Sequence, residues 1–337
     1  MSVTIKDVAK RANTSTATVS KVMNGSYSIS EATCQRVKQA MEELDYHPNQ
    51  TARTFAKQAT KAVVFLSEMD QNSGYSNPQL FEIMCGLEKT LSKKGYALIM
   101  KSIHAKDTPV YVEEAIRTKL CDGFVIHASV ISEELDDLIF GHQIPHIVIG
   151  TPNFQSHLCW IDIDNRLAGE MAVTHLFRQG YQRVAFIGGA EDDNISNHRL
   201  HGIQTVYEKH GLAFGADAIR YSDSSPDSAY ACTMELLKSR RRTDAIICAN
   251  NYIAYGCHLA LKDMNVGIPT DVGLVTFDDY PFSTILKPQL TVVGIDVFDV
   301  GEQAGKYILQ KIKKPNTYVQ SYITVPTLIA RASSLKK

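Results

Sequence analysis

Residues 16 to 21, T-A-T-V-S-K, combine hydroxyls, one amine and small side chains at a spacing that suggests one shared surface. If they form a helix, Val19 points inward and a small, polar, singly basic face points outward. Such a face fits the major groove of DNA, where bulky or acidic groups would meet base edges or phosphate. Lys21 can donate to guanine acceptors, and Thr16 and Ala17 can touch base edges or a thymine methyl. The side chains suited to phosphate contacts are those of Ser15, Thr18, Ser20 and Asn24.

Two short helices joined by a tight turn are needed to hold that face. An apolar stripe predicts the first of them, with the i, i+3, i+4, i+7 spacing of Ile5, Val8, Ala9 and Ala12. Asn13 tolerates the left-handed conformation that ends a helix. Ser15 can then cap a second helix over about residues 16–23. On pattern alone, a small amphipathic helical hairpin with no role in DNA binding is an equal alternative.

A third helix completes the unit. Ser30 is its expected N-cap, and a second stripe follows, made of Val37, Ala40, Met41 and Leu44. Pro48 is expected to stop this helix. Residues 49–59 again favour a helix, but they hold too few apolar side chains to fold without a partner.

Composition limits the remaining classes. The 337 residues are enough for two or three domains, and the net charge of -1 is divided unequally. The first 61 residues hold 9 Lys and Arg against 5 Asp and Glu, a balance of +4, and the remainder holds 26 against 31, a balance of -5. A basic head on an acidic body suits a protein that touches DNA at one end.

Membrane, redox and metal classes receive no support from the sequence. The seven cysteines are scattered without a C-x-x-C pair, so we expect reduced, buried thiols. No run is apolar over the length that a bilayer requires, and the amino terminus lacks the pattern of a signal peptide. We therefore expect a cytoplasmic protein without cofactor or bound metal.

From about Lys61 the pattern changes to short apolar strands that alternate with amphipathic helices, which is typical of βαβ units. The predicted strands are 62–66, 96–100, 123–127, 146–150, 183–188, 218–221, 245–249 and 273–277. The predicted helices are 81–93, 111–119, 133–140, 165–179, 198–209, 227–238 and 253–264. We expect two similar doubly wound halves with a ligand crevice beyond the carboxyl ends of their strands. The chain should cross between the halves near Trp160, Thr291 and Ile323.

These motifs together resemble the LacI/GalR family of bacterial transcription regulators. The family's T-I-x-D-V-A, V-S-x-x-T-V-S-R and N-x-x-A-R-S-L motifs correspond here to residues 4–9, 14–21 and 49–55. The resemblance adds five residues to the expected DNA-binding surface, Thr4, Asn49, Ala52, Arg53 and Phe55. It also implies that a hinge helix orders when two protomers meet on a pseudopalindromic operator. Phe55 replaces the leucine that wedges into the minor groove, and Lys21 replaces an arginine.

The resemblance further implies an effector site. Arg199 in R-L-H-G-I matches the family's R-x-x-G-F, while Asn250 and Asp278 each follow a predicted strand. A guanidinium, an amide and a carboxylate together suit the hydroxyls of a polyol, and Arg199 could also hold a carboxylate. Gln79 and Leu80 replace two aromatic residues that line the family's pocket. Tyr75, Trp160, Tyr252 and Tyr280 are candidate replacements, and Asn251 is expected to cap the following helix.

The predicted organisation is a helix-turn-helix headpiece over residues 1–47, a hinge helix and linker over 48–60, and an effector-binding and dimerisation domain over 61–331. Its N-lobe should comprise about 61–161 and 293–322, and its C-lobe about 162–291 and 323–331. The fold class is α/β with a helical headpiece and a two-lobed, periplasmic-binding-protein-like body. We expect a homodimeric repressor of carbohydrate-utilisation genes, controlled by a sugar-derived effector.

Two alternatives share this body fold. A plain carbohydrate-binding protein would lack the headpiece. A sugar-modifying enzyme would need a nucleophile or a phosphate-binding loop, and neither G-x-G-x-x-G nor G-x-x-x-x-G-K-[ST] occurs in the sequence.

Overall fold

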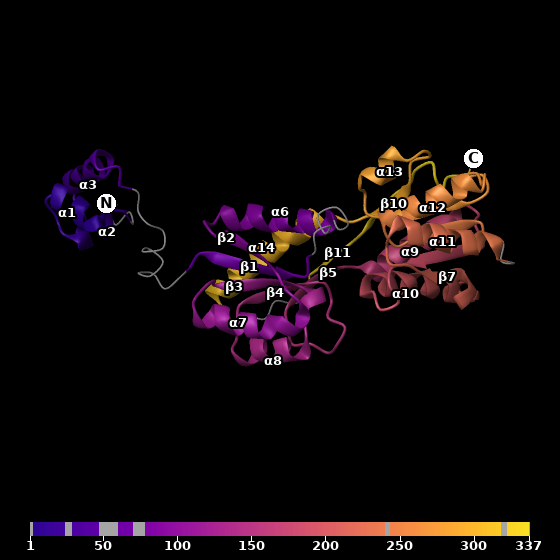
Figure 1. Cartoon of the computed structure of the whole chain (residues 1–337), viewed down its shortest axis with the longest axis horizontal. Coiled ribbons are helices and arrows are strands. Elements are labelled where there is room, and N and C mark those ends of the chain that lie inside the picture. Colours follow the sequence, from indigo (N-terminus) through magenta and orange to yellow (C-terminus); the bar gives the residue numbers. More distant parts are fainter. Residues whose placement is uncertain are drawn as a thin grey trace. The chain divides into compact units, whose positions relative to one another are not determined.

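The computed structural model describes residues 3–23, 29–46, 60–69, 78–239, 243–317 and 322–336. The chain divides into two compact units, Met1–Lys61 and Ala62–Lys337. We call the first the headpiece and the second the effector unit (Figure 1).

The described part of the headpiece is a bundle of three helices, α1 (Ile5–Arg11), α2 (Thr16–Met23) and α3 (Glu31–Glu43). The predicted apolar stripes form its core, in which Val8, Val19 and Val37 are fully buried. Arg11 at the end of α1 forms an ion pair with Glu43 at the end of α3. The core and this pair explain why so short a unit packs as a bundle.

Local signals in the sequence set the helix ends of the headpiece. Asn13 adopts φ 50°, the left-handed conformation expected between α1 and α2. The amide of Thr18 donates to Ser15 Oγ at 3.1 Å, which confirms Ser15 as the cap of α2. Ser30 holds the N-cap position of α3, but its hydroxyl makes no capping bond to the backbone and instead contacts Thr33 Oγ1 at 3.0 Å.

The N-lobe of the effector unit is built on a six-stranded parallel sheet with strand order β11-β5-β4-β3-β1-β2. Its strands are β1 (Ala62–Ser67), β2 (Ala97–Ser102), β3 (Gly123–His127), β4 (His146–Ile149), β5 (Trp160–Ile163) and β11 (Tyr322–Thr324). Its helices are α6 (Pro78–Ser92), α7 (Thr108–Arg117), α8 (Glu133–Gly141) and α14 (Val297–Lys313). Alternate residues of β1 enter opposite cores, because strand side chains alternate between faces. Val63 and Phe65 pack with α6 and α14, while Val64 and Leu66 pack with α7 and α8.

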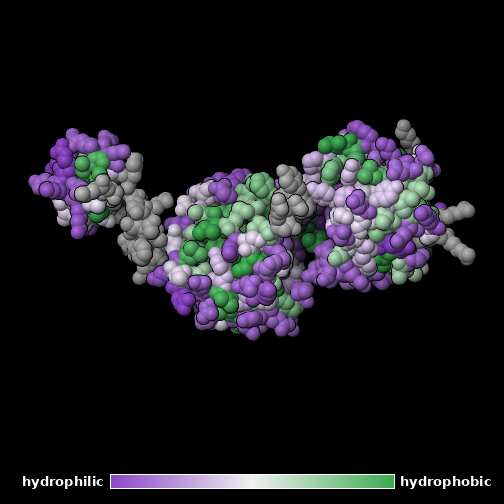
Figure 2. All heavy atoms as spheres, viewed as in Figure 1, coloured by the Kyte–Doolittle hydropathy of each residue, from purple (hydrophilic) through white to green (hydrophobic). Residues whose placement is uncertain are grey.

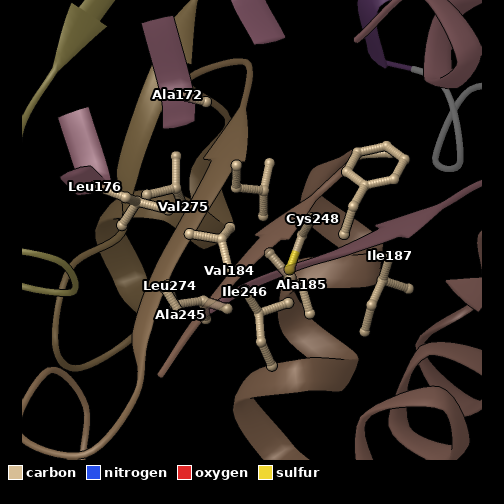
Figure 3. Close-up of a cluster of buried hydrophobic side chains, with 14 of the residues drawn as sticks. Ala172, Leu176, Val184, Ala185, Ile187, Ala245, Ile246, Cys248, Leu274 and Val275 are labelled. Atoms are coloured by element: carbon tan, nitrogen blue, oxygen red, sulfur yellow. The ribbon is translucent and has the colours of Figure 1, made fainter. Parts of the chain in front are cut away.

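The C-lobe repeats this layer structure on a sheet with strand order β12-β10-β9-β8-β6-β7, in which only β12 runs antiparallel to its neighbour. Its strands are β6 (Val184–Gly188), β7 (Ile219–Tyr221), β8 (Ala245–Cys248), β9 (Gly273–Phe277), β10 (Thr291–Gly294) and β12 (Thr327–Ile329). Its helices are α9 (Asn165–Arg178), α10 (Asn194–Lys209), α11 (Pro226–Lys238), α12 (Asn251–Asp263) and α13 (Pro281–Ile285). Figure 3 shows Val184, Ile246 and Val275 of the central strands in one buried cluster with Ala172 and Leu176 of α9.

The described chain passes between the two sheets after β5, after β10 and after β11. These points follow residues 163, 294 and 324, so the predicted crossings near Trp160, Thr291 and Ile323 lie inside strands. The lobe limits drawn at about 161, 291 to 293 and 322 lie two or three residues from these points. Strands of three or four residues are too short to show a periodic pattern in the sequence.

Two glycines bring α9 and α10 into direct backbone contact. A Cβ on Gly169 would lie 2.0 Å from the carbonyl oxygen of Arg199, and a Cβ on Gly202 would lie 2.0 Å from the carbonyl oxygen of Arg166. Any side chain at either position would push the helices apart. The backbone that carries Arg199 is thereby held against α9.

Candidate functional site

The predicted DNA-reading face lies on α2 of the headpiece. Thr16, Ala17 and Lys21 are exposed, while Thr18 and Ser20 are half-buried. Most of the headpiece surface in view is hydrophilic (Figure 2). The outward side chains are therefore available to a partner, with no bulky or acidic group among them.

Three predicted DNA contacts also have structural roles inside the headpiece. Thr4 donates to the carboxylate of Asp7 from its amide at 2.9 Å and from Oγ1 at 2.7 Å, which fixes the start of α1. Ser15 Oγ lies 2.9 Å from Thr18 Oγ1. Asn24, Asn49, Ala52, Arg53 and Phe55 lie outside the described residues, so their roles remain predictions from the sequence.

The effector unit holds a pocket of about 220 Å³ at the carboxyl ends of β6, β8 and β9. Open parallel sheets commonly bind ligands at this edge. The first turn of α6 in the N-lobe contributes to the same wall. The lining residues are Pro78, Gln79, Asp193, Ile195, Ser196, Arg199, Ser224, Ala249, Asn250, Asn251, Tyr252, Asp278 and Tyr280.

Arg199 is the buried cation of this pocket, with 3% of the residue exposed. Its Nε donates to Asn165 Oδ1 at 3.0 Å and its Nη1 donates to the carbonyl oxygen of Ala249. The guanidinium lies 4.1 Å from the centre of the Phe277 ring. Burial lowers the pKa of Arg199, while Asp278 and two further carboxylates oppose this shift. The side chain is held in one geometry and stays charged.

Asp278 follows β9 in the left-handed conformation at φ 66°, which aspartate tolerates better than most residues. Its Oδ2 lies 3.9 Å from Nη2 of Arg199, an ion-pair distance. Burial raises the pKa of Asp278 to about 6, against the opposing effects of Arg199 and Gln79. Its Oδ1 is buried and has no hydrogen-bond partner among the described residues.

Both neighbouring asparagines line the pocket, but the helix cap is Asn250 and not Asn251. Asn250 caps α12, because its Oδ1 accepts from the amide of Ile253 at 2.9 Å. Asn251, the predicted cap, is the first residue of the helix. Its Nδ2 donates to the carbonyl oxygens of Phe277 and Asp278, each at 2.7 Å. The expectation that Asn251 caps the helix was wrong by one residue, and its amide instead ties α12 to the end of β9.

On α6, only one of the two predicted lining residues faces the pocket. Gln79 lines it and approaches Asp278 from the opposite lobe. Leu80 is 5% exposed and packs with Ile83 and Leu87 in the N-lobe core. The prediction that Leu80 contacts the effector was therefore wrong. Consecutive residues point about 100° apart around a helix, so the residue after Gln79 turns toward the sheet.

Tyr252 and Tyr280 supply the aromatic surface of the pocket. Burial, followed by the charges of Glu82 of α6 and of Asp278, raises the pKa of Tyr280, so its hydroxyl stays protonated. Trp160 borders a separate hollow beside the lobe crossings, and Tyr75 lies outside the described residues.

Two residues of the pocket lining, Asp193 and Ser196, were not predicted from the sequence. Asp193 caps α10 and accepts from Ser196 Oγ at 2.6 Å, in the loop that precedes the predicted Arg199. The signal that could have found them is the D-x-x-S spacing typical of a capped helix at a strand's carboxyl end.

Neither a metal site nor a membrane-spanning helix is found among the described residues. No cluster of three or more His, Cys, Asp or Glu side chains in the described ranges has the geometry of a metal site. No helix of the described chain combines the length and apolar character needed to cross a membrane.

Comparison with known proteins decides the family. Residues 4–49 match the model of bacterial regulatory proteins of the lacI family, and residues 173–334 match a periplasmic binding protein-like domain. The regulator GalR of Salmonella typhimurium is 30% identical over 335 residues, covering 98% of this chain and 95% of that protein. This chain belongs to the lacI family. It is a DNA-binding transcriptional regulator, as the headpiece predicted.

Other lacI-family proteins show the same chain-long similarity. The repressor PurR of Escherichia coli O139:H28 is 29% identical, with 98% of this chain and 96% of PurR covered. The lac repressor dimer bound to operator and the anti-inducer ONPF superposes with a TM-score of 0.87 at 21% identity, covering all of both chains. The complex of the regulator CelR with cellobiose gives a TM-score of 0.74 at 24% identity, covering 98% of this chain and 99% of CelR. The predicted fold class is confirmed.

Proposed function

We propose that this lacI-family chain is a homodimeric repressor of carbohydrate-utilisation genes, controlled by a small sugar or sugar-derived effector bound between its lobes. The observation that carries this proposal is the pocket in which Arg199, Asn250 and Asp278 meet Gln79 of the opposite lobe. A buried fork of donors beside amide and carboxylate oxygens suits a ligand that presents several hydroxyls. The complex of CelR with cellobiose supports a carbohydrate ligand.

The pocket gives the effector a mechanical role. Because its lining comes from both lobes, a bound ligand stabilises one arrangement of the lobes relative to others. Gln79 and Glu82 of α6 already approach Asp278 and Tyr280 of the C-lobe. A coupling free energy of about 1 to 3 kcal/mol between effector and operator is enough to switch a promoter.

DNA binding is assigned to α2 and the hinge. Lys21, Thr16 and Ala17 would read the major groove of each half-site. The remaining contacts proposed for the headpiece and hinge are Thr4, Ser15, Thr18, Ser20, Asn24, Asn49, Ala52, Arg53 and Phe55. The structure of the lac repressor dimer bound to operator supports a two-fold symmetric complex with DNA. We place the protein in the cytoplasm, where such a regulator would reach its genes.

Gel shifts of the intact protein on genomic fragments test this function. Lys21→Ala should abolish preference for the selected fragment, while Lys38→Ala, which removes an equal charge from exposed α3, should weaken binding much less. Arg199→Ala should keep DNA binding but remove the response to effector. Arg199→Lys keeps the buried charge without the planar fork, and so separates loss of recognition from loss of folding.

Two results would reject the proposal. The first is a protein that prefers no genomic fragment over bulk competitor DNA, with or without metabolites. The second is a full effector response in Arg199→Ala, Arg199→Lys and Asp278→Ala together.

A further inference from the structure

Among the described residues, carboxylates outnumber cations around the effector pocket. Asp193 and Asp278 line it, and the charge of Asp162 also acts on the guanidinium of Arg199. Among the described lining residues, Arg199 is the only Lys or Arg.

The positive charge of Arg199 is already engaged by protein groups. Its Nε and Nη1 donate to Asn165 and to the backbone of Ala249, and its Nη2 faces Asp278. An anionic ligand that approached this fork would also approach the Asp278 carboxylate. Repulsion between like charges in a buried site weakens binding strongly.

Two buried acceptors in the lining lack donors. Oδ1 of Asp278 and Oδ1 of Asn251 have no hydrogen-bond partner among the described residues, and each residue is 4% exposed. A buried acceptor without a donor is unfavourable until a donor arrives. Hydroxyl groups donate, whereas ionised carboxylates and phosphates only accept.

We propose that the ligand of this pocket is a neutral polyol whose hydroxyls donate to Asp278 and Asn251, and that its carboxylated and phosphorylated forms are rejected. This inference rests on the proposed function and narrows its effector to one charge class. Tyr252, Tyr280 and Pro78 complete the match, because they offer apolar surface to the C–H faces of such a ligand.

Calorimetric titration of the intact protein with matched probes tests the charge class. The probes are glucose, gluconate and glucose 6-phosphate, together with the neutral, acid and phosphate forms of galactose and ribose, and cellobiose. At least one neutral probe should bind, and the acid and phosphate forms of the binding sugar should bind at least about tenfold more weakly.

One substitution should change the discrimination itself. Asp278→Asn removes the carboxylate, so the ratio of neutral to phosphate affinity should shrink several-fold while the neutral sugar also binds more weakly. Asp137→Asn, on the exposed face of α8, removes the same charge from outside the pocket and should leave the ratio unchanged. A melting curve for each variant reports folding.

The outcomes separate the inference from the proposed function. Binding of an acid or phosphate probe as tightly as its neutral parent overturns the inference, and so does failure of every neutral probe at millimolar concentration. If an anionic metabolite controls DNA binding, the proposed function is supported but the inference of a neutral effector is refuted. If a neutral sugar binds in this pocket without altering operator affinity, the inference is supported but the proposed function is refuted.

Discussion

Replacing Gly169 with alanine tests whether helix packing positions the effector site. The new Cβ would lie 2.0 Å from the carbonyl oxygen of Arg199, whereas ordinary contact begins near 3.4 Å. To relieve this overlap, α10 must move away from α9 by about 1 Å. Because the clash is with a backbone oxygen, we take the upper part of the usual overpacking cost, roughly 2 to 3 kcal/mol. Alanine recovers about 1 kcal/mol of helix propensity. We therefore expect Gly169→Ala to lower the free energy of unfolding by about 1 to 2 kcal/mol.

The same displacement should reach the ligand. Arg199 is part of α10, so the shift should weaken its hydrogen bonds to Asn165 and Ala249 and displace its guanidinium group in the pocket. Affinity for effector should fall, while the headpiece, a separate unit, should still bind DNA.

Thermal unfolding monitored by circular dichroism measures the stability effect. A loss of about 1 to 2 kcal/mol corresponds to a melting temperature lowered by roughly 3 to 6 °C. Gly141→Ala is the matched control, because Gly141 ends α8 and a Cβ there meets no atom within 4 Å. Equal melting temperatures for the two variants, or unchanged effector affinity in Gly169→Ala, would refute the role given to this contact.

Three further substitutions or conditions give distinct outcomes. Ser15→Ala removes the cap of α2 at a cost of about 1 kcal/mol, so hydrogen exchange at the Thr18 amide should quicken about fivefold; unchanged exchange would contradict the cap. His146 is buried with its Nε2 accepting from the Cys159 amide at 3.0 Å, and burial lowers its pKa to about 4. Its neutral form contributes stability that is fully present above pH 6.5 and is lost as pH falls toward 4, about 2 kcal/mol by pH 5. Urea unfolding at pH 7 and pH 5 should show this loss in the natural chain and not in His146→Gln. Asn251→Asp removes the donor shared by two carbonyl oxygens and should lower the unfolding free energy by at least about 2 kcal/mol, which an unchanged melting curve would disprove.

Most of the α/β framework was predictable because its elements are long or fully buried. β3 was predicted over the residues that form it, and α2 likewise. α14, a helix of 17 residues, was not predicted, although its buried residues recur at helical spacing. In the structure Gly301 and Gly305 admit α6, since a Cβ on Gly301 would lie 2.0 Å from the carbonyl oxygen of Ile83. Glycine lowers helix propensity, but here it permits the close approach of two helices.

The candidate site shows a similar division. Arg199, Asn250 and Asp278 were found from the family motif together with their places after predicted strands, and the structure brings them together in one pocket. The predictions for Leu80 and Asn251 each erred by one position along a helix. Sequence spacing fixes the presence of a helix better than its starting residue, and one residue turns a side chain by about 100°.

Asp278 lies in an energetically unfavourable environment, which a hydrogen-bond donor from a ligand would relieve. Asp278 combines a left-handed backbone, a raised pKa, an unpaired Oδ1 and an ion pair at 3.9 Å that forms no direct hydrogen bond. Buried pairs of this kind are weak contributors to stability, and strain of this kind gathers at functional sites. The proposed ligand, which would donate to Asp278 while contacting Gln79, would therefore also restrain α6. Because α6 follows β1, the first strand after the headpiece, that restraint acts on the segment of the effector unit nearest the linker in sequence. The free energy gained in satisfying the pocket is in this way available to bias operator binding, without any contact between effector and DNA.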